Sequence, residues 1–183
     1  MIAGPPRGAV APAARRLGFA LSAFAGAAQT LSFAPWEFWW LQPLAVGALV
    51  ALLAGASPRD AALRGWAFGA GWLTTGLWWI YISLHTYGHL PAWLAALAVG
   101  VLAGLLSLYY AVAAWAWARS RRGRTTVDAL TFAALWLLAE LARGEFFTGF
   151  PWIAGGYAHT CGALARWAPY VGVYGLGAIS AWI

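Results

Sequence analysis

The chain contains very little charge. Only 9% of its 183 residues are Asp, Glu, Lys or Arg, and no lysine or asparagine occurs anywhere. Soluble domains carry about 25% charged and about 45–50% apolar residues, whereas 63% of this chain is hydrophobic. The shortage of charge therefore excludes an ordinary soluble domain and indicates an integral membrane protein.

Cysteine and grouped metal ligands are also scarce. Cys161 is the single cysteine, which excludes an internal disulfide, and no pair or cluster of ligand residues indicates a metal site. No set of His, Glu and Lys neighbours Cys161 to activate it as a nucleophile, so we interpret it as a small apolar residue. We expect no metal, no cofactor and no catalytic residue in this chain.

The basic residues are all arginines, eleven against five acids, and the pI is near 10. A strongly basic chain can indicate nucleic-acid binding. Here the arginines cluster in short runs between apolar stretches, which is typical of membrane topology signals. We therefore expect no nucleic-acid partner.

Apolar runs of membrane-spanning length follow one another along the chain. A bilayer core about 30 Å thick needs roughly 17 to 25 apolar residues as helix. A sixth run begins after Pro169 and reaches Ile183 without a closing charged flank, so we expect an amino-terminal fragment that stops within a helix. The prediction is an all-α, polytopic transmembrane helix bundle with a truncated sixth span and five full spans, at 17–33, 36–54, 66–84, 91–117 and 126–142.

Residues 1–16 are predicted to be a cytoplasmic tail and 17–183 the transmembrane domain. Nine of the eleven arginines fall on alternate loops, and the positive-inside rule then makes the amino terminus cytoplasmic. The segment 143–166 would face the periplasm from the inner membrane of a bacterium. An alternative is that the first run is a cleaved signal peptide, because Ala25-Gly26-Ala27 resembles a small-residue cleavage site.

A charged pair stands near the end of the fifth run. Glu140 and Arg143 are three residues apart and share one face of a helix. Each would cost roughly 2.5–3.5 kcal/mol unpaired at a membrane helix centre. One alternative is a purely mutual ion pair. The other is a pair that also orients a loop or holds an anionic headgroup, for which the arginine fork is suited.

The backbone that follows Gly144 cannot stay helical through Gly149-Phe150-Pro151, since proline removes a donor and disfavours helix before it. Non-helical backbone at membrane depth must be buried or line a cavity. We therefore predict a re-entrant or interfacial loop near 144–157. Its residues Phe150, Pro151, Trp152 and Tyr157 are candidates for a wall or gate that an acyl chain meets, with simple packing as the alternative.

A second polar and aromatic group lies after the third run. His85 and Tyr87 follow Trp79 and Tyr81 toward the same outer side, and together they are candidates for a rim around a lipid headgroup. The alternatives are an ordinary aromatic belt and, for His85, an interfacial hydrogen bond. Two histidines in a loop without further acids or cysteines do not make a metal site.

Three pairs of glycines have the spacing that lets membrane helices approach closely. We interpret them as helix-packing positions: Gly65 with Gly69, Gly100 with Gly104, and Gly172 near Gly175.

The late part of the chain adds spaced aromatic, glycine and proline positions to the charged pair: Trp136, Glu140, Arg143-Gly144, Thr148-Gly149-Phe150-Pro151-Trp152, Gly156-Tyr157, Ala168-Pro169 and Gly172-Val173. Earlier segments add Phe33-Ala34-Pro35, Gly69, Gly76, Trp79-Ile80-Tyr81-Ile82-Ser83 and Gly88 to Pro91. From about Leu17 onward, this pattern resembles the membrane domain of bacterial apolipoprotein N-acyltransferase.

The resemblance implies a reaction and its partners. The family transfers an acyl chain from a phospholipid to the amino-terminal diacylglyceryl-cysteine of a lipoprotein, through a thioester in a nitrilase-like domain inserted after a seventh span. No catalytic residue of that domain matches a position here, so we expect an inactive membrane platform with the phospholipid, the lipoprotein and the bilayer as partners. Rival readings are a lipid-binding or transport protein and the membrane domain of a polyprenyl-phosphate mannosyltransferase fusion.

Overall fold

A computed structural model describes residues 12–183, and within that part of the chain every regular element is helical. The all-α prediction is therefore confirmed for these residues. Most of the predicted tail, residues 1–11, lies outside the described residues. Residues 12–16 form the start of helix α1 (Pro12–Gln29), because Ala13, Ala14 and the two arginines after them are good helix formers.

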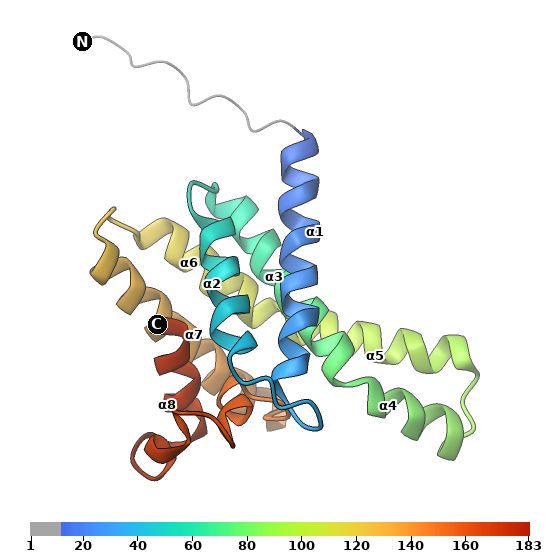
Figure 1. The fold of residues 1–183 in the computed structure, drawn as a ribbon. Helices are drawn as coiled ribbons and strands as arrows, with labels where there is room; N and C mark the ends of the chain where they lie inside the picture. Colours follow the sequence, from blue (N-terminus) through green and yellow to red (C-terminus); the bar gives the residue numbers. More distant parts are fainter. Residues whose placement is uncertain (1–11) are drawn as a thin grey trace.

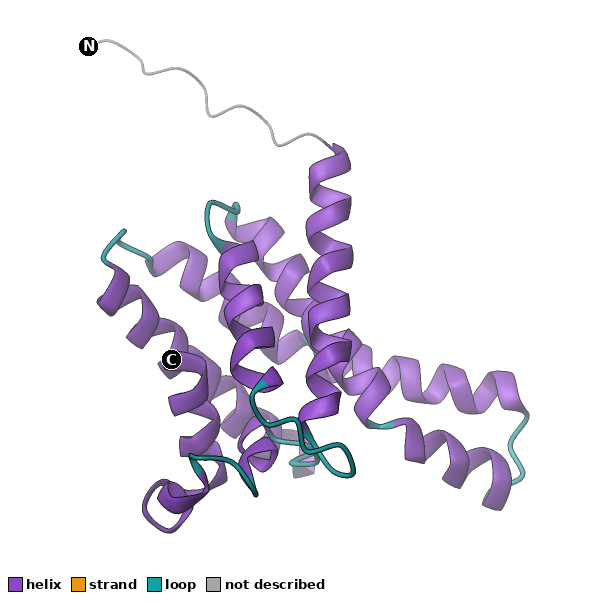
Figure 2. Ribbon diagram, viewed as in Figure 1, coloured by secondary structure: helices purple, strands orange, loops and turns teal. Residues whose placement is uncertain are grey.

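The helices form a bundle with one projecting arm (Figure 1; Figure 2). Helices α4 and α5 extend away from the other six, and we call 78–106 the arm. The bounds are α1 Pro12–Gln29, α2 Leu41–Leu53, α3 Pro58–Gly76, α4 Trp78–Ile82, α5 Ala92–Leu106, α6 Leu108–Ser120, α7 Thr125–Glu145 and α8 Ala168–Trp182. Short 3-10 segments lie at Thr30–Ser32, Phe146–Thr148, Gly155–His159 and Ala165–Trp167, and a π turn at Ser83–Tyr87.

The third predicted run, 66–84, differs most from the structure. Helix α3 begins eight residues earlier, at Pro58, because Ser57 caps it by accepting a hydrogen bond from the Asp60 amide at 3.2 Å. The helix ends before Leu77, where the backbone leaves helical geometry, and the short α4 starts the arm. The hydropathy of the sequence did not predict either end of α3, because a helix cap and a bend do not change the average apolarity of a segment.

Two helical segments in the described part of the chain, Ala92–Ser120 and Thr125–Thr148, are long and apolar enough to cross a membrane. Helix α2 has only 13 residues, and α1 and α3 carry arginines in their first turns. Each of the five predicted runs contains a helix, but the predicted number of full spans is not confirmed.

Close helix contacts depend on glycine at two interfaces. A Cβ added at Gly26 of α1 would lie 1.9 Å from the Phe68 carbonyl oxygen of α3, and one at Gly65 of α3 would lie 2.6 Å from the Tyr110 oxygen of α6. The predicted packing role therefore holds for Gly65. The contact at Gly26 was not predicted.

The other predicted glycine positions fare differently. A Cβ at Gly69 would be 2.7 Å from the Tyr110 ring of α6, which confirms the packing role there. At Gly100 and Gly172 nothing lies within 4 Å of the added Cβ, so the packing prediction is wrong for both. Gly172 has φ +65° and interrupts α8 instead. Spacing alone could not distinguish a buried glycine from one that bends an exposed helix.

The two ends of the bundle differ in charge. The start of α1, the α2–α3 turn and the α6–α7 turn lie at one end (Figure 1). Arg121 joins the two turns by donating to the carbonyls of Leu53 at 3.1 Å and Ala56 at 2.8 Å. We call this the basic end. Residues 30–40 and 146–167 lie at the opposite, loop end. The predicted alternation of arginine-rich turns is therefore present in three dimensions.

Candidate functional site

The last turns of α7 carry the charged pair at the loop end. Glu140 and Arg143 are each 1% exposed, and Arg143 Nη2 lies 3.4 Å from Glu140 Oε1. The pairing expected from their spacing is present. Burial of both charges means that each needs further hydrogen bonds, because a pair alone does not compensate the loss of hydration.

Arg143 obtains those bonds from the loop that follows it. Its Nη1 donates to the carbonyl oxygens of Phe150 at 2.6 Å and Trp152 at 2.9 Å. In return, the Phe150 amide donates to the Arg143 carbonyl at 2.7 Å. The guanidinium therefore fixes two peptide groups on either side of Pro151.

Glu140 extends the arrangement to α6 and farther along the loop. Its Oε1 accepts from the Tyr110 hydroxyl, and its Oε2 accepts from the Gly155 amide at 2.7 Å. Tyr110 is 1% exposed. We call Tyr110, Glu140 and Arg143 the clamp, because together they tie α6 and α7 to the loop segment 150–155.

The surroundings of Arg143 bear on whether the charged pair orients a loop or holds a headgroup, which the spacing of the two residues left open. The Arg143 guanidinium is enclosed, with its Cζ 6.0 Å from the centroid of the Trp72 ring, and two of its nitrogens are engaged by the loop and Glu140. This geometry favours the alternative in which the pair orients a loop over the one in which Arg143 holds a headgroup.

The backbone held by the clamp is strained. Phe147, Thr148, Gly149 and Ile153 all have positive φ, between 50° and 76°, a region that residues other than glycine rarely adopt. Helix α7 ends at Glu145, so the non-helical loop predicted near 144–157 is present. The chain returns to α-helix at Ala168, after three short 3-10 segments.

The loop turns its apolar side chains outward around the buried clamp. Phe147 is 95% exposed, Trp152 56% and Tyr157 50%. Pro151 is also exposed, whereas Phe150 is half-buried and packs against the core. Of the predicted wall residues, the structure thus presents Pro151, Trp152 and Tyr157 at the surface.

The arm meets this loop through one aromatic contact. The ring of Trp79 lies 5.9 Å from that of Trp152 in an edge arrangement. His85 sits farther along the arm, where its Nδ1 is 2.8 Å from the Leu90 carbonyl, and Tyr87 is 78% exposed near the tip. Trp79, rather than His85 or Tyr87, makes the aromatic contact with the loop.

An apolar groove of about 950 Å³ runs beside the clamp. Helices α5 and α6 supply one wall, including Leu105, Tyr109 and Val112, and α7 supplies the other, including Leu138 and Ala142. Residues 146–150 of the loop close one end. The groove therefore joins the outer surface of the helices to the loop that the clamp holds.

A second buried polar cluster, which the sequence reasoning missed, lies behind the loop. The Gln42 Oε1 of α2 is 3.1 Å from the His159 Nε2 and accepts from the Ser180 hydroxyl of α8. All three are at most 2% exposed, and burial lowers the pKa of His159. The sequence contains one signal for this cluster: Gln42 and Ser180 are polar residues within two of the apolar runs.

Gly155 separates this cluster from the clamp. A Cβ added there would lie 3.3 Å from Gln42 Nε2 and 3.7 Å from Glu140 Oε2. A side chain at this position would press on both polar groups at once. Because Gly155 has no side chain, the loop backbone can enter between α2 and α7.

Cys161 follows in an exposed turn, with its sulfur 3.7 Å from the Thr160 hydroxyl. Within residues 12–183, no group of three His, Cys, Asp or Glu side chains is arranged to hold a metal ion. The described residues offer buried hydrogen bonds that hold the loop and an apolar groove beside them.

Comparison of the sequence with known proteins shows which family and which relatives it resembles. Residues 25–183 match the family described as apolipoprotein N-acyltransferase N-terminal domain. The chain is 50% identical over 184 residues to the apolipoprotein N-acyltransferase of Ralstonia nicotianae, covering 98% of this chain and 35% of that protein. Its identity is 50% over 166 residues to the enzyme of Verminephrobacter eiseniae, covering 86% and 31%, and 44% over 156 residues to that of Pseudomonas putida, covering 84% and 31%. The chain thus spans about a third of the length of these relatives.

Proposed function

The chain belongs to the apolipoprotein N-acyltransferase family, and from this we propose that it is the membrane platform of such an enzyme. The enzyme would transfer an acyl chain from a phospholipid to the amino-terminal diacylglyceryl-cysteine of lipoproteins during their maturation. The relatives' names support the acyltransferase over the lipid-transport and mannosyltransferase alternatives.

The observation that carries the proposal is the junction of groove and loop. An acyl chain needs an apolar path that opens sideways to lipid, and the reacting ester must be held at a fixed depth. The groove of about 950 Å³ supplies the path, and its closed end is the loop that the clamp fixes through Phe150 and Trp152. Holding the donor in one position is a substantial share of what catalysis requires.

The site residues have distinct roles in this proposal. Phe150 and Pro151 form a stiff wall at the end of the groove, and Trp152 and Tyr157 contact the lipid that passes it. Glu140 and Arg143 act through the loop and do not touch the lipid. The exposed His85 and Tyr87 of the arm form the outer rim near the headgroup.

The proposed orientation follows from the charges. The basic end would lie in the cytoplasm and residues 143–166 at the periplasmic face of a bacterial inner membrane, since arginine-rich turns are retained on the inner side. The helices would cross as five spans, with α8 starting a sixth. Reporter fusions or cysteine labelling at the α6–α7 turn test this, and labelling of that turn from outside intact cells contradicts it.

The thioester chemistry would come from the part of the relatives beyond the matched third. We expect residues 1–183 expressed alone to transfer no acyl chain, because neither the clamp nor the groove contains an activated nucleophile. Mass spectrometry of the isolated chain after incubation with phospholipid tests this. A lipid-derived acyl thioester on the chain would refute the assignment of a supporting role.

The proposed role of Trp152 is tested in a full-length enzyme of the family. Trp152→Ala should lower acyl transfer to a lipoprotein substrate by about tenfold or more, a loss typical of misplacing a reactant. The matched control is Trp167→Ala, because Trp167 is similarly exposed at 51% on the same side. Equal activity of the two variants would remove the case for Trp152.

The groove is tested separately by filling it. Ala142→Phe puts a ring between the walls, and it should raise the KM for phospholipid more than it lowers the rate at saturation. Ala134→Phe, at an exposed position of the same helix outside the groove, is the control. A KM for phospholipid that stays equal in both variants would place the acyl chain elsewhere.

A further inference from the structure

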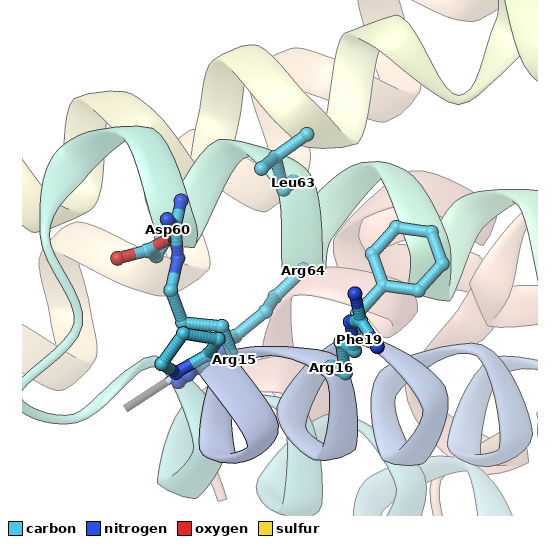
Figure 3. Close-up of a pocket in the computed structure, with 7 residues that line it drawn as sticks. Arg15, Arg16, Phe19, Asp60, Leu63 and Arg64 are labelled. Atoms are coloured by element: carbon cyan, nitrogen blue, oxygen red, sulfur yellow. Dashed lines mark hydrogen bonds and ion pairs between the residues drawn. The ribbon is translucent and has the colours of Figure 1, made fainter. Parts of the chain in front are cut away.

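A second pocket lies at the basic end and shares no lining residue with the groove. It has a volume of about 340 Å³ and lies between the first turns of α1 and α3. Figure 3 shows Arg15 beside Asp60 on one side of it and Arg16 beside Phe19 on the other. We call it the basic pocket, and its other lining residues are Pro12, Leu63 and Arg64.

The charges of the basic pocket do not cancel. Asp60 is neutralised by Arg15, whose Nε and Nη2 both lie 2.7 Å from its Oδ1, and Ser57 donates a further hydrogen bond at 2.8 Å. Three arginines against one carboxylate leave two positive charges. Within residues 12–183, Arg16 makes no ion pair.

Arg64 is held so that its guanidinium faces α1. Its Nη1 donates to the Leu52 carbonyl at the end of α2. Its Nε and Nη2 lie 2.8 Å from where a Cβ on Gly18 would stand. The lack of a side chain at Gly18 therefore leaves room for the guanidinium between α1 and α3, where it adds fixed positive charge to the pocket.

Apolar walls continue from the arginines toward the middle of the bundle. Phe19 is 39% exposed and Leu63 50% exposed, and each lies about one helical turn inward from an arginine or acid of its own helix. Phe19 is fixed by stacking on Trp66, with the ring centroids 6.3 Å apart and the planes at 24°. Along the basic pocket, positive charge thus lies at the end of the bundle and apolar surface lies next to it, toward the middle of the bundle.

We propose that the basic pocket binds an anionic phospholipid, with the phosphate between Arg16 and Arg64 and an acyl chain along Phe19 and Leu63. Arginine binds phosphate through charge-assisted hydrogen bonds, and basic pockets between membrane helices are suited to anionic headgroups. A free phosphate would use the arginines but would leave the apolar wall uncovered. The wall therefore favours the lipid.

Such a lipid would bridge α1 and α3, the two helices whose backbones meet at Gly26. A ligand that binds the folded chain stabilises it in proportion to occupancy. The proposal does not depend on acyl transfer, since the loop lies at the other end of the bundle (Figure 1) and the groove is lined by none of the residues of the basic pocket. Acyl transfer can fail its tests without affecting it.

The experiment measures thermal unfolding of the 183-residue chain in an uncharged detergent. Phosphatidylglycerol, phosphatidylcholine and glycerol 3-phosphate are titrated separately. Phosphatidylglycerol should raise the Tm saturably, and the other two should not. A response to glycerol phosphate as large as that to the lipid, or equal responses to both lipids, would overturn the proposal.

Variants locate the site. Arg16→Gln, at an exposed position that leaves the fold intact, should weaken phosphatidylglycerol binding by about tenfold or more, the loss expected for one charge-assisted contact. Arg59→Gln is the matched control, since Arg59 is exposed next to Asp60 but does not line the pocket. Equal weakening by both would mean that overall charge, and not the pocket, attracts the lipid.

The apolar wall has its own test. Leu63→Gln keeps the charges and should weaken phosphatidylglycerol binding several-fold through loss of apolar contact. Affinity equal to that of the unaltered chain would contradict an acyl chain along this wall, even if Arg16→Gln had its expected effect.

Discussion

The two ends of the bundle each have an arginine that holds a turn of chain, but the two arginines differ in burial. At the basic end, Arg121 is partly exposed and donates to the carbonyls of Leu53 and Ala56. At the loop end, Arg143 is 1% exposed and donates in the same manner to Phe150 and Trp152. Both arginines hold a turn of chain, but only Arg143 is accompanied by a buried carboxylate.

The difference follows from solvation. A partly exposed guanidinium keeps contact with water or headgroups, so its loss or the loss of its partner can be compensated. The loss of a buried guanidinium cannot be compensated in this way, and that of Arg143 depends on Glu140 and the loop carbonyls, which engage two of its nitrogens. The loop end should therefore be sensitive to substitution, and the basic end should be tolerant.

The largest effect is expected for Arg143→Met. The change leaves the buried Glu140 carboxylate without its cationic partner and two loop carbonyls without their donor, which should lower the free energy of unfolding by about 3–5 kcal/mol. Unfolding of the purified chain in mixed micelles, followed by circular dichroism, measures this. The control is Arg166→Met, an exposed arginine on the same side, which should change stability by about 0.5 kcal/mol or less.

The double variant with Glu140→Gln should recover part of the loss, because it removes both charges together. If Arg143→Met unfolds no more easily than Arg166→Met, the contrast between the two ends is wrong.

The next largest effect on stability is expected at two glycines, Gly149 at the loop end and Gly123 at the basic end. Gly149 and Gly123 have similar φ, +76° and +72°, so alanine at either should cost about 1–2 kcal/mol for the left-handed backbone. A Cβ at Gly149 would also lie 1.9 Å from the Gly144 carbonyl oxygen, whereas at Gly123 nothing lies within 4 Å. Gly149→Ala should therefore lose about 1–3 kcal/mol more.

The same unfolding assay compares these two variants. Equal losses would mean that the loop relaxes freely around the new methyl group and that the clamp does not fix it.

A smaller effect concerns pH at the loop end. Burial lowers the pKa of His159, so between that value and the ordinary pKa of about 6.5 the unfolded chain binds a proton that the folded chain does not. Stability should therefore fall as the pH drops below about 6.5. His159→Gln, which cannot titrate, should show a flatter profile between pH 8 and pH 5.5, and parallel profiles would contradict the argument.

The smallest effect is expected for Arg15→Gln at the basic end. Arg15 is 52% exposed where it pairs with Asp60, and exposed pairs contribute about 0.2–1 kcal/mol. The loss should shrink further in high salt because screening weakens an exposed pair. A loss as large as that of Arg143→Met, measured in the absence of added lipid, would remove the distinction between the ends.

Several features of the site could be predicted from local pattern. The spacing of Glu140 and Arg143 predicts their pairing, and Gly149-Phe150-Pro151 predicts the break in the helix, because both depend on residues within one or two turns. The alternation of arginine-rich turns predicts which turns share an end. The exposed Trp152 and Tyr157 were also identified in this way.

Other features could not be predicted, since they depend on which helices become neighbours. Tyr110 reaches Glu140 from 30 positions away, and Gln42 reaches His159 from 117 positions away. No spacing rule connects such pairs. The arm was likewise missed, because the bend at Leu77 divides a run that hydropathy presents as continuous.

The apolarity of the residues and the order of the charges along the chain were sufficient to predict a helical membrane protein with one basic side and one broken helix. The role of Arg143 depended on the surrounding fold. A buried polar atom must find a partner wherever packing puts one, and for Arg143 packing supplied the carbonyls of the loop. That contact made the charged pair a clamp on the loop.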